Sequence, residues 1–69
     1  MNVEVMGLRQ FASEARTKLN AVIGFAEILL DGHAGSITTE QQDLLSAIRM
    51  SGKEILALVM ALSEEDIIT

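Results

Sequence analysis

Few side chains in this sequence could carry out chemistry by themselves. Cysteine is absent, which excludes disulfide bonds and thiolate metal sites together. The one histidine, His33, would need several carboxylates converging on it before it could hold a zinc ion. Arg16 and Lys18 form a basic pair that either offers a local site to a phosphate or an acidic partner, or is simply solvated. We therefore predict no metal site and no cofactor.

Charge and length narrow the classes of protein further. Ten acidic residues stand against five basic ones, and the net charge of −5 argues against nucleic acid and against an anionic membrane surface as partners. No apolar run reaches the ~20 residues that a bilayer requires, and the N-terminus lacks the pattern of a signal peptide. We expect a cytoplasmic protein. A chain of 69 residues is one domain at most, and without disulfides or a metal it is expected to gain stability by oligomerisation.

The elements that must position these residues are two helices. Hydrophobic residues make up 49% of the chain, but only two residues are aromatic and none is proline. The segment 31–36 has two glycines beside Asp and Ser, which marks a loop. Gly32 is placed to cap the preceding helix, while Thr38 and Gln41 have the spacing of a capping box for the next. We predict helices over about 5–30 and 39–63 joined by a loop over 31–38, as one hairpin domain over 1–69.

Apolar residues in both segments recur at alternating steps of four and three, which is the seam of a left-handed helix bundle. The seam comprises Leu8, Ala12, Ala15, Leu19, Val22, Ala26 and Leu29 in the first segment, and Leu44, Ile48, Ser51, Ile55, Leu58 and Leu62 in the second. A second apolar set flanks it, namely Phe11, Ile23, Leu30, Leu45 and Val59. An exposed face of this width would cost ~1.5–3 kcal/mol for each large side chain left in water. We predict an all-α, antiparallel two-helix hairpin that homodimerises into a four-helix bundle, with the seam residues other than Ala26 and Ser51 as its dimer core.

Residues 11–30 read FASEARTKLNAVIGFAEILL. They resemble the first helix of the dimerisation and histidine-phosphotransfer domain of sensor histidine kinases, where Ser-His-Glu-Leu-Arg-Thr-Pro-Leu-Asn precedes an apolar stretch that often contains Ile-Gly-Phe. The resemblance extends from Leu8 to Leu62 and includes the loop and the start of the second helix. The matching residues of the motif and its apolar stretch are Glu14, Arg16, Thr17, Leu19, Asn20, Ile23, Gly24, Phe25 and Leu29.

The chain departs from the family where the chemistry occurs. The phosphate-accepting histidine falls on Ser13, and the proline falls on Lys18. A neutral imidazole is a good nucleophile near neutral pH, whereas a hydroxyl is weak unless a base activates it. Glu14 is adjacent to Ser13, but successive helix positions point about 100° apart, so its carboxylate is poorly aimed. No ATP-binding domain follows within the 69 residues. The resemblance therefore implies the fold without the kinase chemistry.

Three hypotheses follow. The first is a non-enzymatic regulator of two-component signalling that binds a response-regulator receiver domain or a histidine kinase through Ser13, Glu14, Arg16, Thr17 and Lys18. The second is an enzyme: either a phosphotransfer protein that uses His33, or a receiver phosphatase that uses Thr17, because the family's threonine at this place helps to position water. The third is a dimerisation fragment of a longer degenerate kinase. A loop lacks the groove against which a receiver docks, which favours a purely structural His33.

Overall fold

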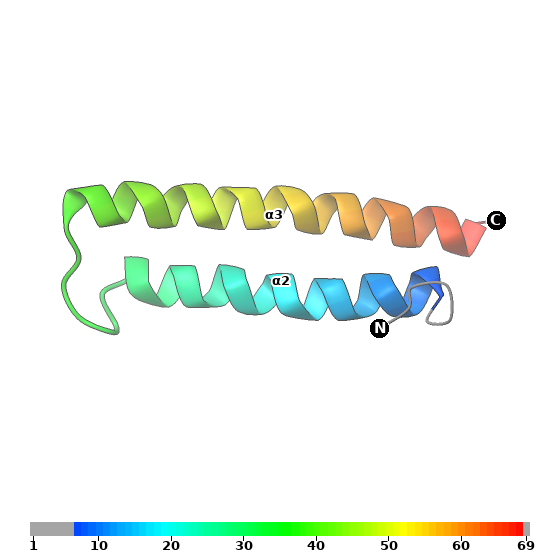
Figure 1. Ribbon diagram of the computed structural model, residues 1–69, viewed down its shortest axis with the longest axis horizontal. Helices are drawn as coiled ribbons and strands as arrows, with labels where there is room; N and C mark the ends of the chain where they lie inside the picture. The colour runs from blue at the N-terminus through cyan, green and yellow to red at the C-terminus, as the bar shows by residue number, and fades with distance from the viewer. Residues whose placement is uncertain (1–6, 69) are drawn as a thin grey trace.

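The two predicted helices lie side by side and antiparallel. The computed structural model describes residues 7–68, with side chains as far as Leu62. Helix α2 covers Leu8–Leu30 and helix α3 covers Thr39–Ile68. The loop between them reverses the chain, so that both helices run along the long axis of the molecule (Figure 1). No strand is present in the described part of the chain, and the predicted all-α hairpin is confirmed.

The outer ends of the helices lie at Leu8 and Ile68, and the end of α3 differs from the prediction. Helix α2 begins at Leu8 because Gly7 has a φ of 84°, a conformation outside the helix that glycine adopts without strain. The predicted start near Val5 lies outside the described residues. Helix α3 continues to Ile68 instead of ending near Ser63. Residues 63–68 contain neither glycine nor proline, so nothing in the sequence stops the helix there.

The loop end of α2 has the geometry of a Schellman motif. Gly32 has a φ of 79°, and its N–H donates to the carbonyl of Leu29 at 3.2 Å. The N–H of His33 donates to the carbonyl of Ile28, also at 3.2 Å. These bonds satisfy carbonyls that have no partner within the helix. Gly32 thus has the capping role that was predicted for it, and the backbone of His33 is part of the same turn.

A reciprocal pair of hydrogen bonds starts α3. The N–H of Thr38 donates to Oε1 of Gln41 at 2.9 Å, and the N–H of Gln41 donates to Oγ1 of Thr38 at 3.0 Å. This is the predicted capping box, in which each side chain satisfies the other residue's amide. Glu40 lies in the first turn, where a negative charge interacts favourably with the helix dipole.

Removal of this cap should weaken the hairpin measurably. Thr38→Ala deletes the acceptor for the Gln41 amide, and loss of an N-cap costs about 1 kcal/mol. For a chain of this size that corresponds to a fall in Tm of roughly 4–8 °C, measured by circular dichroism at a fixed protein concentration. Thr39→Ala, one position into the helix, is the control and should not lower Tm, because alanine has the higher helix propensity. Equal falls in Tm for the two variants would contradict the role given to Thr38.

Small side chains bring the helices close together. Ala12, Ile23 and Ala26 are the buried hydrophobic residues among those described, and all three lie on α2. Opposite them on α3 is Gly52, where an added Cβ would lie 2.9 Å from Cγ1 of Ile23. That distance is too short for an ordinary contact, so the helix backbones approach closely because residue 52 has no side chain. A Cβ added at Gly24 would meet nothing within 4 Å, so this glycine makes no such approach.

The two glycines should therefore respond oppositely to alanine. Gly24→Ala gains helix propensity without a clash and should raise the free energy of unfolding by about 0.5–1 kcal/mol. Gly52→Ala gains the same propensity but must displace Ile23, and overpacking of this kind costs about 1–3 kcal/mol. We expect Gly52→Ala to be less stable than Gly24→Ala by at least about 1 kcal/mol in urea unfolding. Equal stabilisation by both substitutions would exclude the close approach at Gly52.

A single hairpin buries side chains along the contact between its two helices but forms almost no hydrophobic core. Its radius of gyration is 15.0 Å, whereas a compact domain of this length has one of about 11 Å. The molecule measures 46 × 21 × 15 Å, so in its thinnest direction it is barely wider than one helix with its side chains. Among the described residues, no large side chain is fully buried. A single copy therefore leaves much of its apolar surface in water.

Candidate protein interface

One long side of the hairpin is apolar and exposed. We call it the apolar flank, and its members, each between 37% and 70% exposed, are Leu8, Phe11, Val22 and Leu29 of α2 and Leu44, Ile48, Ile55, Leu58 and Leu62 of α3. On α3, several of these residues come one position before a residue that is turned toward α2. Leu44 precedes the half-buried Leu45, and Leu58 precedes the half-buried Val59. One position is about 100° of helix rotation, so the flank lies beside the seam between the helices.

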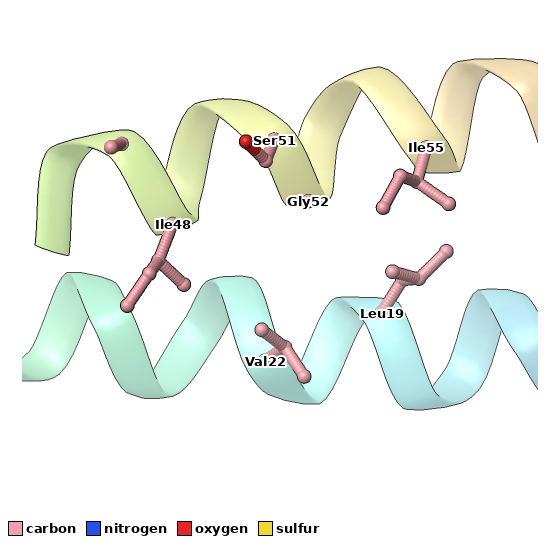
Figure 2. A pocket seen from close by; sticks show the side chains of 7 residues that line it. Leu19, Val22, Ile48, Ser51, Gly52 and Ile55 are labelled. Carbon is pink, nitrogen blue, oxygen red and sulfur yellow. The ribbon is translucent and has the colours of Figure 1, made fainter. Parts of the chain in front are cut away.

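Two shallow grooves follow this flank. The first has a volume of about 340 Å³ and lies between the helices, where Leu19 and Ile55 point toward one another (Figure 2). The second, of about 400 Å³, lies near the loop and is lined in part by Leu29, Ile37 and Leu44. Ile48 lines both grooves, which therefore adjoin at this residue. Of the side chains that line the first groove, only that of Ser51 is polar.

The apolar flank has the area of a protein–protein interface. Aromatic side chains bury about 150–250 Å² each, and the aliphatic side chains that make up most of the flank are near the lower end of this range. Nine residues exposed by about half therefore present roughly 700 Å². The largest apolar patch on a typical monomer is about 300–600 Å². A stable complex buries about 800 Å² on each partner. The exposed area of the flank is thus larger than the largest apolar patch of a typical monomer. It is close to the area that each partner buries in a stable complex.

The predicted dimer core divides into two sets. Ala12 is already buried inside the single hairpin, and Ala15 and Leu19 are partly buried there. The remaining members, all of them on the apolar flank, are exposed: Leu8, Val22, Leu29, Leu44, Ile48, Ile55, Leu58 and Leu62. Sequence reasoning did not single out Leu56, which is half-buried, or distinguish Gly52 from Gly24. The position of Gly52 inside the apolar repeat was the feature of the sequence that could have indicated the close approach of the two helices.

Ser13, Thr17 and Asn20 lie on the other side of α2. Each comes four or three positions after the last, so the three form one exposed stripe, which we call the polar stripe. The hydroxyl of Thr17 donates to the backbone carbonyl of Ser13 at 3.1 Å. On the same side of the hairpin, Nζ of Lys53 lies 3.8 Å from Oε2 of Glu27, an exposed pair that contributes little to stability.

The other predicted partner-binding residues do not all join this stripe. Glu14 and Lys18 are exposed, but each follows a stripe residue by one position and so points about 100° away from it. Arg16 is exposed as well, on the edge nearer α3. The structure therefore brings Ser13 and Thr17 together with Asn20, and spreads the charged residues of the motif around the helix.

His33 is far from the motif. It is exposed and lies in the loop beyond the end of α2. Ser13 is about 25 Å from the loop end of α2, along the helix axis at 1.5 Å per residue. Among residues 7–68, no group of three or more His, Cys, Asp or Glu is placed to hold a metal ion. In the same part of the chain, neither helix is long and apolar enough to cross a membrane.

The sequence is related to part of a histidine kinase. Over 53 residues, which are 75% of this chain, it is 45% identical to the cell-division control histidine kinase PdhS of Brucella anthropi. It is 43% identical over the same length to the proteins of that name in Brucella ovis and Brucella abortus. The chain spans about 5% of the length of these curated relatives. No family model matches the chain, and no solved structure matches it significantly.

The class of protein that follows from these findings is a helical hairpin that contains a histidine-kinase-related region. The similarity supports a context of two-component signalling.

Proposed function

We propose that this chain is a non-catalytic regulator of two-component signalling. In this proposal it is a hairpin of the histidine-kinase type that binds a response-regulator receiver domain or a histidine kinase. Two findings support the proposal: the similarity to a segment of PdhS, and the two-helix hairpin with one apolar and one polar side.

The observation that carries the proposal is the position of Ser13. It is exposed on the polar stripe, at the place where the motif of sensor histidine kinases has its phosphate acceptor. A serine hydroxyl needs a base to become a nucleophile, and Glu14 points away from it. The imidazole of His33 is at the opposite end of α2. In this proposal the exposed polar stripe is the surface that a partner recognises, and Ser13 stands in place of the group that would accept the phosphate.

A homodimer is part of this proposal. The apolar flank is the surface that a second copy would cover, and two-fold pairing is the commonest way to cover it. Two hairpins joined through this face make a four-helix bundle in which both polar stripes remain accessible. The area estimated for the flank supports this arrangement.

Binding and phosphotransfer assays test the proposal together. Receiver domains and histidine kinases from the same cell would be titrated against the chain by calorimetry. We expect binding to at least one of them. The chain would then be incubated with phosphorylated receivers. We expect no label on the chain and an unchanged lifetime of the phosphoryl group. Absence of binding to every receiver and kinase would overturn the regulator, and label on the chain would overturn its lack of catalysis.

A receiver phosphatase is the second candidate, and the geometry of Thr17 favours it over phosphotransfer by His33. The Thr17 hydroxyl is exposed and is held by its bond to the carbonyl of Ser13, which leaves its lone pairs able to accept a hydrogen bond from water. A phosphatase would shorten the lifetime of the phosphorylated receiver, and Thr17→Ala would restore it. An unchanged lifetime with the unmodified chain would exclude this candidate.

A further inference from the structure

We infer that the apolar flank also pairs with the matching segment of a PdhS-like histidine kinase, so that one hairpin from each protein forms a mixed four-helix bundle. The inference rests on the proposed function and deepens it, because it names the partner that this particular face takes. It concerns the apolar flank, whereas binding of a receiver domain would use the polar stripe.

The first argument is that the apolar flank leaves large hydrophobic side chains in water, and a partner would bury them. Leu58 is 70% exposed, and Leu44, which lines the second groove, is 59% exposed. The exposed area of roughly 700 Å² is close to the ~800 Å² that each partner buries in a stable complex. A partner of matching length, made of two helices with the same repeat, would cover the flank from Leu8 to Leu62.

The second argument is that the flank has little that restricts it to its own copy. Partner choice between helix bundles usually depends on a buried polar residue or on charges beside the seam. The members of the flank are all hydrocarbon side chains, and the polar side chain in the first groove is the small hydroxyl of Ser51. Lys18, which is four positions before Val22, is an exposed charge beside the flank on α2. A surface that is complementary to itself under two-fold symmetry is also complementary to a close copy of itself.

The third argument is that the kinase offers such a copy. Any stretch of 53 residues in a chain of 69 includes residues 18–52, and therefore the second half of α2, the loop and the first half of α3. This part contains Val22, Leu29, Leu44 and Ile48 of the flank. Identity of 45% over the 53 aligned residues supports the same helical hairpin in the kinase segment.

The consequence would be a bundle with unequal halves. The kinase would contribute its own pair of helices, while this chain would contribute a helix with Ser13 at the position that resembles the phosphate acceptor of the sensor histidine kinase motif. Each kinase subunit held in this way is unavailable to a second kinase subunit, because the same face is occupied. The chain would then limit the kinase by subunit exchange, without any catalytic step.

Energy transfer between labelled proteins tests this inference. The chain, labelled with a donor, is mixed with full-length PdhS of Brucella anthropi labelled with an acceptor. We expect an energy-transfer signal that grows as subunits exchange. Addition of excess unlabelled chain should reverse this signal. Ile48→Glu and Leu58→Glu should each reduce the signal at least tenfold, whereas Met50→Glu, on the outer side of α3, should leave it within twofold. Circular dichroism would establish that each variant is helical.

The outcomes separate this inference from the proposed function. A chain that pairs with itself but gives no transfer with the kinase would overturn the mixed bundle. If that chain still binds a receiver domain, the proposed function stands while the inference fails. If it binds neither receiver nor kinase, both fail. A signal that persists in Ile48→Glu and Leu58→Glu would show that the contact uses another face, which also overturns the inference.

Discussion

Ile48→Glu should dissociate the homodimer that we propose for this chain. Ile48 lines both grooves of the apolar flank and is 47% exposed in the single hairpin, so a glutamate there costs the monomer little. In a two-fold dimer the change places two carboxylates in an apolar interface. Each must be desolvated without a partner or keep water in the interface. We expect the dissociation constant to rise at least 100-fold, or about 3 kcal/mol, as measured by sedimentation equilibrium.

Met50 supplies the matched control. It lies two residues further along α3 and is 63% exposed, but two positions rotate it about 200° away from Ile48, out of the grooves. Met50→Glu adds the same charge to the same helix and should change the dissociation constant less than threefold. If Ile48→Glu dimerised as tightly as Met50→Glu, the apolar flank would not be the interface.

Ser13→His should convert the chain into a phosphate acceptor. The position is exposed on the polar stripe, and an imidazole there would be a neutral nucleophile near pH 7. After incubation with a PdhS-like kinase and radiolabelled ATP, we expect the unmodified chain to carry no label. The variant should carry at least ten times the background, and the label should be lost in acid, as is typical of phosphohistidine.

Glu14→His is the control for this substitution. It introduces the same imidazole one position later, about 100° around the helix from the polar stripe. We expect its label to remain at background. Equal labelling of the two variants would mean that any exposed imidazole on α2 is phosphorylated, and the correspondence between Ser13 and the family's histidine would lose its support.

The hairpin could be predicted from the sequence because its signals are local. Gly32 ends α2, and Thr38 with Gln41 starts α3, through contacts between residues at most five positions apart. The ends farther from the loop were less predictable. Glycine is tolerated inside many helices, so the sequence did not show that Gly7 would take a positive φ and delay the start of α2.

The division of the apolar residues between seam and flank was not predictable in the same way. Apolar or small residues occur in adjacent pairs on α3, such as Leu44 with Leu45 and Leu58 with Val59. Hydrophobicity alone does not tell which member of a pair meets α2 and which faces outward. Gly52, where an added side chain would clash with Ile23, is a residue of α3 that meets α2, and this approach between distant residues is visible only in three dimensions.

The unequal ends of the hairpin have a consequence for its local opening. At one end the turn after α2 and the cap of α3 hold the helices together, whereas contacts near Leu8 and Leu62 must close a much longer stretch of chain and so cost more entropy. Amide protons near the loop should therefore exchange with solvent more slowly than those at the far end. Ser13 belongs to the half that opens first, so a ligand clamped over the polar stripe would slow exchange most in that half.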